Sequence, residues 1–167
     1  RLANNGEYVV KDLSAITDEV LNACPDGVEL VYWDYYSDSQ RGYDTMIKMH
    51  KQLKGEVWFA GGAWSWSGVC PKNHFSLWVT PAQLQLAEKY GVKNVFATCW
   101  GDDGAECAIF NILPALLQYA EYNYADISTA TLEQRSMDCF GISFEDFCKI
   151  DTVGRLPDSY SDSAQHP

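Results

Sequence analysis

Three short apolar runs, each followed by a segment with helical spacing, constrain the fold of this chain more than any other feature. The runs are VELVYWDYY (28–36), EVWFAGG (56–62) and KNVFATCW (93–100). The helical patterns that follow them cover residues 43–53, 81–90 and 104–122. Near-continuous apolar strands that alternate with helices are typical of a parallel sheet with both faces covered. The sequence therefore predicts the α/β class.

Capping residues and further helical patterns suggest where the helices lie. Thr80 and Pro81 have the residue types of an N-cap and a first helical position, and Gly91 suits the C-terminal end of the same helix. One more helix is expected before the first strand, at residues 15–23. Two short helices are expected near the C-terminus, at residues 131–141 and 143–150, with a frayed polar tail after them.

The charge of the chain excludes several classes of partner. Of its 167 residues, 12 are Lys or Arg and 23 are Asp or Glu, which gives a net charge of -11. This charge repels polyphosphate, so we expect binding neither to nucleic acid nor to an anionic membrane surface. No apolar run reaches the roughly 18 residues that a membrane-spanning helix needs. The chain begins at Arg1 without Met, and we expect it to be part of a longer protein.

The cysteine pattern favours a reducing compartment. The six cysteines include no C-x-x-C pair, and several lie inside apolar runs, where a thiol packs as a small apolar group. We therefore expect a cytoplasmic protein with reduced thiols, although the even number of cysteines leaves disulfides open.

Aromatic and acidic residues gather where each apolar run ends. The clusters are Trp33-Asp34-Tyr35-Tyr36, Trp64-Ser65-Trp66 and Trp100-Gly101-Asp102-Asp103. Ligands of parallel α/β folds bind at the carboxyl ends of the strands, so three clusters at that edge predict one shared pocket. An indole face can cover the C–H patch of a pyranose, while a carboxylate accepts hydrogen bonds from its hydroxyls. The clusters therefore favour a sugar site.

Trp64 and Trp66 are two residues apart, and alternate side chains of an extended segment share a face. Gly61 and Gly62 before them allow the end of the strand to turn closely. We expect at least one of the two indoles to face the sugar, and the sequence leaves open which one.

At these residues the chain resembles glycoside hydrolase family 20, the β-N-acetylhexosaminidases, in particular a bacterial intracellular branch. The similar stretches are VYWDYY, HKQLKGEVWFAGGAWSWSG, NHFS and VFATCWGDDGAECAIFNILPALLQYAEY, which cover most of residues 28–122. The resemblance implies a (β/α)8 barrel of TIM type, of which this chain would supply about strands six to eight. Residues 1–127 would then be a partial barrel, and residues 128–167 a short helical C-terminal extension.

The resemblance also implies a retaining, substrate-assisted mechanism, in which the acetamido oxygen of the substrate attacks its own anomeric carbon. In the family, an adjacent Asp-Glu pair in an H-x-G-x-D-E context orients the acetamide and protonates the leaving oxygen. Here the adjacent Asp-Glu pair is Asp18-Glu19, which follows Thr17 in a helical pattern and is better explained as the acidic first turn of a helix. We therefore expect no catalytic residues in this chain.

The sugar-binding side of the pocket is what the resemblance assigns to this chain. Trp33 would be a wall of the acetamido pocket, Trp100 the indole that closes it, and Asp102 the carboxylate that binds outer hydroxyls. Trp64 or Trp66 would contribute from the strand between them. Asp34 and Tyr35 are weaker candidates. Trp33 could instead belong to the core, and Asp34 could cap a helix.

Other kinds of site are poorly supported. DDGAE (102–106) brings three carboxylates close together, but it lacks the D-x-D-x-D-G spacing of a calcium loop. His50, His74 and His166 are far apart in sequence, so we expect no metal ion and no cofactor. His74 could be a structural or a binding residue. Phosphate-binding glycine loops and the G-x-S-x-G motif are both missing from the sequence.

Two hypotheses about function remain. In the first, the chain is part of a β-N-acetylhexosaminidase that cleaves terminal β-linked N-acetylglucosamine or N-acetylgalactosamine from glycans. In the second, it is a non-catalytic carbohydrate-binding half-barrel that acts alone or as an oligomer. In either case a half-barrel leaves sheet edges and apolar interior uncovered, so we expect it to associate with the missing N-terminal part of the barrel or with a second copy of the chain.

Overall fold

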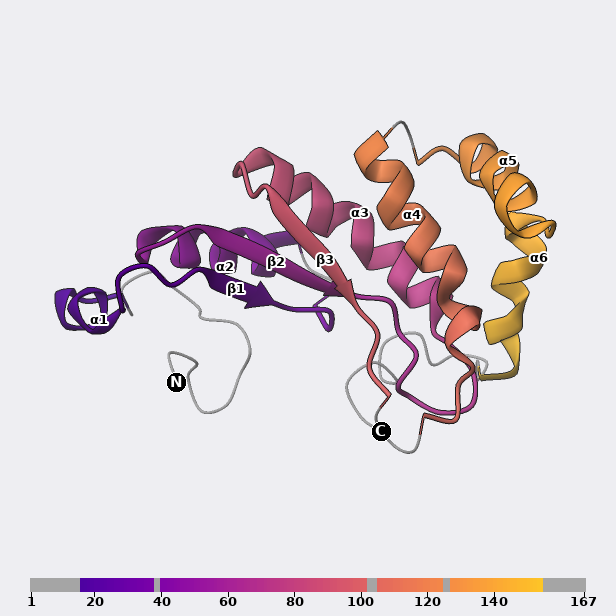
Figure 1. Ribbon diagram of the computed structural model, residues 1–167, viewed down its shortest axis with the longest axis horizontal. Coiled ribbons are helices and arrows are strands. Elements are labelled where there is room, and N and C mark those ends of the chain that lie inside the picture. Colours follow the sequence, from indigo (N-terminus) through magenta and orange to yellow (C-terminus); the bar gives the residue numbers. More distant parts are fainter. Residues whose placement is uncertain (1–15, 38–39, 102–104, 125–126, 155–167) are drawn as a thin grey trace. The chain divides into compact units, whose positions relative to one another are not determined.

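The computed structural model describes residues 16–37, 40–101, 105–124 and 127–154 (Figure 1). Strands and helices alternate through its first three modules, which confirms the α/β class. The elements in chain order are α1 (Asp18–Ala23), β1 (Leu30–Trp33), α2 (Gln40–Gln52), β2 (Val57–Gly62), α3 (Asn73–Lys89), β3 (Asn94–Thr98), η4 (Ile109–Ile112), α4 (Leu113–Tyr124), α5 (Thr129–Phe140), α6 (Phe144–Cys148) and η5 (Lys149–Gly154), where η marks a 3-10 helix.

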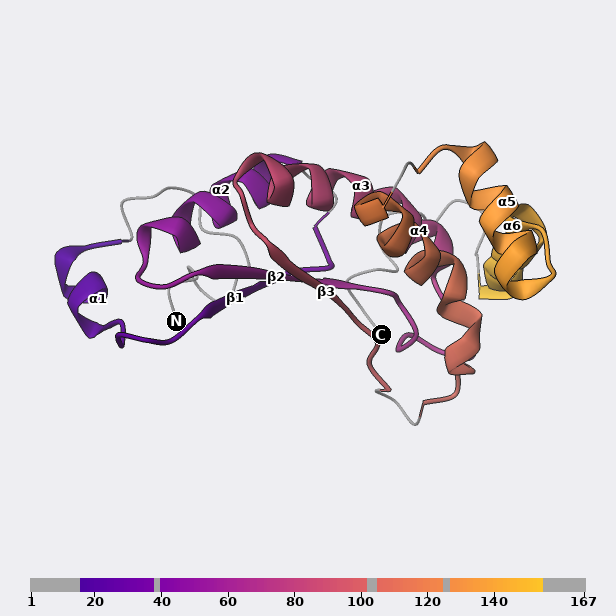
Figure 2. The same cartoon turned by 45° about the horizontal axis from the view of Figure 1, so that its top comes forward.

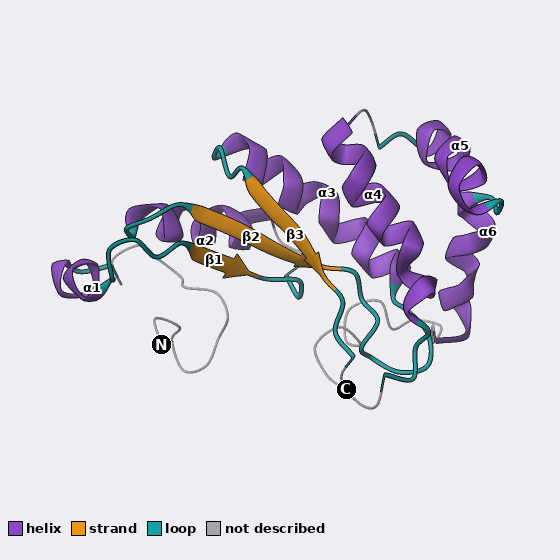
Figure 3. Cartoon of the chain, in the orientation of Figure 1, coloured by secondary structure: helices purple, strands orange, loops and turns teal. Residues whose placement is uncertain are grey.

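The three strands form one parallel sheet in the order β1-β2-β3 (Figure 3). In the register of β1 and β2, Leu30 lies opposite Val57 and Trp33 lies opposite Ala60. The apolar run 28–36 is longer than β1, because the chain turns after Trp33, at Asp34. All three expected strands are therefore present, and each is shorter than its apolar run.

The chain divides into two compact units, which we describe separately. Unit 1 contains the described residues within 1–61 and 82–96, and unit 2 contains those within 62–81 and 97–167. The expected border between residues 127 and 128 lies inside unit 2. There an ion pair of 3.3 Å joins Arg135 of α5 to Glu121 of α4, across that border.

Unit 1 has helices on one face of its strands, as Figure 2 shows for α2. The buried core between strands and helices is made of Tyr32, Tyr43, Met46, Ile47, Met49, Val57, Phe59, Leu86, Ala87 and Val92. The residues that alternate with this core along the strands lie on the other face of the sheet and are exposed. The exposed fractions of Val31, Trp33 and Phe96 are 47%, 51% and 42%. Trp58 lies among them, in an edge-on contact with Phe96. Among the described residues, nothing in unit 1 buries this apolar sheet face.

Helix α3 begins at Asn73, so the expected start at Thr80 and Pro81 is wrong. Pro81 lies inside the helix, where it cannot donate a hydrogen bond to the carbonyl of Leu77 four residues before it. The Gln118 side chain replaces that donor, since its Nε2 lies 3.2 Å from the Leu77 carbonyl oxygen. A side chain far along the sequence therefore makes the internal proline tolerable.

The other expected helix ends agree better with the structure. Gly91 ends α3 with a positive φ of 65°, and its N–H donates to the Glu88 carbonyl. Thr17 caps α1, which places Asp18 and Glu19 in the first turn of that helix, as the sequence predicts. The two short C-terminal helices are also confirmed as α5 and α6.

The expected helix at residues 104–122 is wrong in its first half. A 3-10 turn, η4, covers Ile109–Ile112, and the α-helix begins only at Leu113. Pro114 follows directly, in the first turn of α4, where a proline costs no backbone hydrogen bond. The periodic apolar residues before Pro114 therefore do not extend the α-helix towards residue 104.

Unit 2 buries both apolar and polar groups. One of its apolar clusters is made of Ala63, Ile112 and Ala115, and Leu116 packs against it. Its buried polar residues are Ser65, Asn73, Ser76, Thr80, Gln118, Glu121, Ser136 and Asp151. Across the described ranges, we find no helix with the length and apolarity needed to cross a membrane. All six cysteines are free thiols.

Candidate functional site

The segment of residues 63–72, here called the tryptophan segment, follows β2 in unit 2. Its two indoles stack on each other, with ring centroids 4.4 Å apart and an angle of 26° between the planes. The expectation that Trp64 and Trp66 leave the chain on a common side is therefore confirmed. Both side chains are buried, at 2% and 6% exposure, although serines and a glycine surround them in the sequence.

Trp64 is the more enclosed member of this pair. The Phe75 ring lies nearly perpendicular to it, with ring centroids 5.3 Å apart, and the Lys72 ammonium lies 5.4 Å from the centre of the Trp64 ring. Burial lowers the pKa of Lys72, whose charge is offset by the electron-rich indole face. Trp64 thus holds the segment together, and Trp66 stacks on this anchored ring.

Hydrogen bonds close the tryptophan segment onto the first turn of α3. The Lys72 N–H donates to the Trp64 carbonyl at 3.0 Å, which ties the two ends of the segment together. The Trp64 N–H donates to the Ser76 hydroxyl at 3.1 Å, and this hydroxyl donates to the Lys72 carbonyl at 3.1 Å. Ser76 is fully buried, so the segment has a fixed attachment to the helix.

The segment that follows β3 lies against the tryptophan segment. The Ser65 hydroxyl donates to the Trp100 carbonyl at 2.8 Å, and the Ala63 N–H donates to the Thr98 carbonyl at 2.9 Å. Trp100 keeps 38% of its surface exposed. Two of the three expected clusters therefore meet in unit 2, while Asp102 lies outside the described residues and its role stays a prediction.

The third cluster belongs to unit 1, and its acidic residue is fully engaged. Asp34 is buried, and its Oδ2 accepts a hydrogen bond of 2.8 Å from the Tyr32 hydroxyl. Its Oδ1 accepts from the backbone N–H groups of Tyr36 and Ser37, at 2.9 and 3.1 Å. Burial raises the pKa of the Asp34 carboxyl, and these hydrogen bonds act against that rise. The described contacts thus make Asp34 the residue that turns the chain after β1.

Trp33 and Tyr35 differ in exposure, although their rings are in contact. The ring centroids lie 5.8 Å apart, and Tyr35 also packs against Tyr36 at 4.6 Å. Trp33 is half exposed, while Tyr35 is buried at 3% exposure. The sugar-binding roles expected for them, and a pocket shared with the unit 2 indoles, stay predictions.

A pair of a partly buried His74 and a buried Asp151 in unit 2 was not predicted from the sequence. His74 Nδ1 lies 2.6 Å from Asp151 Oδ2, and the same oxygen accepts the backbone N–H of His74 at 2.9 Å. Asp151 lies in η5 and its side chain is fully buried. These residues are 77 positions apart, so no local pattern reveals the pair.

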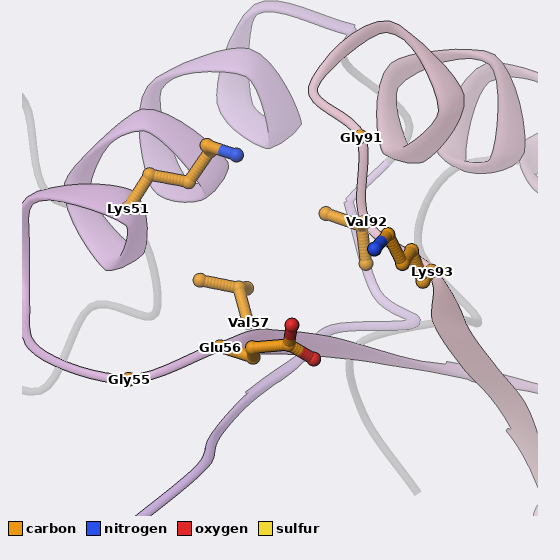
Figure 4. A pocket seen from close by; sticks show the side chains of 7 residues that line it. All are labelled: Lys51, Gly55, Glu56, Val57, Gly91, Val92 and Lys93. Atoms are coloured by element: carbon orange, nitrogen blue, oxygen red, sulfur yellow. The ribbon is translucent and has the colours of Figure 1, made fainter.

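A pocket of about 230 Å³ lies in unit 1, at the beginning of β2 and β3 (Figure 4). It is lined by Lys51, Gly55, Glu56, Val57, Gly91, Val92 and Lys93. The Lys51 ammonium donates to the Tyr90 carbonyl at 2.6 Å. This pocket is at the opposite end of the strands from the aromatic clusters, and no expectation from the sequence concerned it.

Neither a metal site nor an acidic catalytic pair is found in the part of the chain that the structure describes. No group of three or more His, Cys, Asp or Glu side chains there is arranged to hold a metal ion. Asp18 and Glu19 lie on the short helix α1 and not at the end of a strand. Of the three indoles after β2 and β3, Trp100 keeps 38% of its surface exposed, while Trp64 and Trp66 are buried.

Comparisons with models of known protein families and with curated proteins found no match to this chain. The glycosidase family expected from the sequence motifs therefore stays a prediction.

Proposed function

We propose that this chain is the C-terminal part of a family 20 β-N-acetylhexosaminidase and supplies the sugar-binding side of its pocket. The observation that carries this proposal is the bond between Ser65 and the Trp100 carbonyl. It joins the segments after two neighbouring parallel strands, and both segments belong to the motifs on which the resemblance rests. The two linked segments carry three indoles, and the partly exposed Trp100 is the one whose face could cover the apolar side of an aminosugar.

The sheet supports the barrel part of the proposal. Parallel sheets in α/β proteins are normally covered on both faces, and in unit 1 the described helices cover one. Val31, Trp33 and Phe96 on the other face would then be interior residues of a closed (β/α)8 barrel. The N-terminal strands of the same barrel, or a second copy of the chain, would cover this face.

In the proposed mechanism this chain binds and orients the sugar and does not transfer the proton. The acetamido oxygen of the substrate attacks the anomeric carbon, and an acid outside this chain protonates the leaving oxygen. Trp66 and Trp100 would exclude water from the sugar face, and Asp102 would accept hydrogen bonds from outer hydroxyls. Substrate assistance needs an acetamido group held rigidly, and the anchored indole pair suits that task.

The proposed substrates are glycans with terminal β-linked N-acetylglucosamine or N-acetylgalactosamine, without a cofactor or metal ion. We propose a cytoplasmic location, because six free thiols in one chain are typical of a reducing compartment.

A second candidate function is a non-catalytic carbohydrate-binding half-barrel. The position of Asp18-Glu19 in the first turn of α1 favours it, because this adjacent Asp-Glu pair is then structural. Under this alternative the same indoles bind a sugar, but no partner restores hydrolysis.

Release of p-nitrophenol from p-nitrophenyl N-acetyl-β-glucosaminide separates the two candidates. The enzyme proposal predicts turnover when the chain is assembled with the N-terminal part of the barrel, and none by the chain alone. The binding candidate predicts affinity for N-acetylglucosamine without turnover in either case. Trp100→Ala should weaken the affinity under both candidates. Turnover by the chain alone would contradict the assignment of the acid to another part of the protein.

A further inference from the structure

We propose that Asp151 is a positioning residue for the aminosugar site, which it holds in shape through His74 and the first turn of α3. The inference rests on the proposed function, and it assigns a role in the site to the C-terminal segment. That segment would otherwise be a helical extension outside the barrel.

The contacts of Asp151 provide the first step. One buried carboxylate oxygen accepts the backbone N–H of His74 at 2.9 Å and lies 2.6 Å from its Nδ1. A carboxylate that is removed from water needs such donors to offset the cost of desolvation. The position at the N-terminus of the 17-residue helix α3 also favours a negative charge, because unpaired N–H groups gather there. Asp151 therefore fixes both the main chain and the imidazole ring of His74.

The same helical turn holds the tryptophan segment. Ser76, two residues after His74, accepts the Trp64 N–H and donates to the Lys72 carbonyl. Asn73 on the same turn donates from its side chain to the Asn111 carbonyl at 2.8 Å, next to the start of α4. The turn is thus held by η5 on one side and by η4 on another, and the tryptophan segment is bonded to it.

Loss of the Asp151 carboxylate should move the indoles and not only lower the stability of unit 2. Without it, the first turn of α3 loses two hydrogen bonds, one of which anchors its main chain. The Trp64 N–H follows the Ser76 hydroxyl, and Ser65 carries the shift to the Trp100 carbonyl. Sugar affinity depends on indole positions to within about an ångström, so it should fall even in fully folded protein.

The test compares Asp151→Ala and Asp151→Asn with the unmodified chain, at a temperature where far-UV circular dichroism shows all three to be folded. Affinity for N-acetylglucosamine is measured by tryptophan fluorescence. The indole pair is followed separately by its exciton couplet in circular dichroism. We expect Asp151→Ala to bind about tenfold more weakly, as loss of charge-assisted hydrogen bonds implies, and to lose most of the couplet. For Asp151→Asn, the affinity and the couplet should lie between those of the unmodified chain and Asp151→Ala, since the amide oxygen still accepts the His74 N–H.

Ser136→Ala is the matched control. Ser136 is also fully buried in unit 2, and its hydroxyl donates to the Ile142 carbonyl at 2.8 Å, without a described bond to the tryptophan segment. It should lower stability while leaving the couplet and the affinity unchanged. The proposal is overturned if Asp151→Ala behaves in the same way as this control.

Two further results keep the test decisive. If Asp151→Ala does not fold, Asp151→Asn and His74→Gln take its place, and an unchanged couplet in both variants overturns the proposal. If the unmodified chain does not bind N-acetylglucosamine, the proposed function fails, while the couplet still decides whether Asp151 positions the indoles.

Discussion

Single residues in this chain carry structural roles that their sequence context conceals. Asp34 follows a tryptophan at the end of a strand, which predicts a ligand, yet its two oxygens accept three hydrogen bonds from the chain itself. Asp151 lies in a polar C-terminal segment without a motif, yet it is bonded to His74. The two backbone N–H groups that Asp34 accepts belong to residues close to it in sequence, so this turn could have been anticipated. The Asp151 contact spans 77 positions and could not.

Asp34 should make stability depend on pH in a defined direction. Its pKa in the folded protein is above the ordinary value of 3.8 because of burial. The folded state therefore holds this proton more tightly than the unfolded state. The resulting stabilisation is fully present below pH 3.8 and is lost as the pH rises through the folded-state pKa.

Asp34→Asn cannot titrate, so the free energy of unfolding of the unmodified chain should fall relative to this variant over that pH interval. Urea titrations at a series of pH values measure the difference, and a rise instead of a fall would show that the hydrogen bonds outweigh burial.

The stacking of Trp64 on Trp66 predicts a spectroscopic signature. Two indoles with centroids 4.4 Å apart should couple, so either Trp64→Phe or Trp66→Phe should abolish the same exciton couplet in circular dichroism. Trp78→Phe is the control, since Trp78 is 57% exposed and its ring contact is with Phe75. A couplet that survives both single substitutions would mean that the indoles are not stacked in solution.

At the scale of elements, the alternation of strands and helices was predictable and several boundaries were not. Apolar runs identify buried strands well, because the requirement to fill both faces of a parallel sheet acts along the whole run. The start of α3 was predicted eight residues too late, because Thr80-Pro81 is a good local start signal. The structure overrides that signal with a side chain from α4, Gln118. A tertiary contact of this kind cannot be predicted from a local sequence pattern.

The pairing of Gln118 with the internal proline predicts a coupling energy. Gln118→Met keeps the volume but leaves the Leu77 carbonyl without its side-chain donor, and it should cost about 1–2 kcal/mol of unfolding free energy. In the Pro81→Ala background the helix supplies its own N–H to that carbonyl, so the same substitution should cost about 1 kcal/mol less.

A double-mutant cycle by urea unfolding measures this coupling. Gln134→Met on the exposed surface of α5 serves as the control and should change stability by less than about 0.5 kcal/mol. If Gln118→Met lowers the free energy of unfolding equally whether residue 81 is Pro or Ala, the glutamine does not compensate for the proline.

At the scale of the whole molecule, the sheet face of unit 1 that none of that unit's described residues covers is the feature that most needs a partner. The α/β class alone does not reveal it, because the sequence pattern of a strand buried on both faces is the same whether the covering chain is present or not. The resemblance to a barrel anticipates such a face, and the exposure of Val31, Trp33 and Phe96 is consistent with that expectation.

This face should bind an apolar dye and promote association of the isolated chain. Phe96→Lys places a charge on this face, on the outer strand β3. It should lower the fluorescence of bound 8-anilinonaphthalene-1-sulfonate. It should also lower the concentration-dependent increase in sedimentation coefficient. Met137→Lys is the matched control, because Met137 is similarly exposed, at 47%, but lies on α5 in unit 2. If both substitutions change dye fluorescence and association equally, the sheet face is not the surface through which the chain associates.

The central claim is that the indoles after β2 and β3 bind an aminosugar, and an NMR titration of the tryptophan indole N–H signals tests it most directly. On addition of N-acetylglucosamine, the signals of Trp66 and Trp100 should shift together and saturate, while glucose, which lacks the acetamido group, should shift them far less. Indole signals of Trp66 and Trp100 that stay unchanged, or that shift equally with glucose, would contradict the claim.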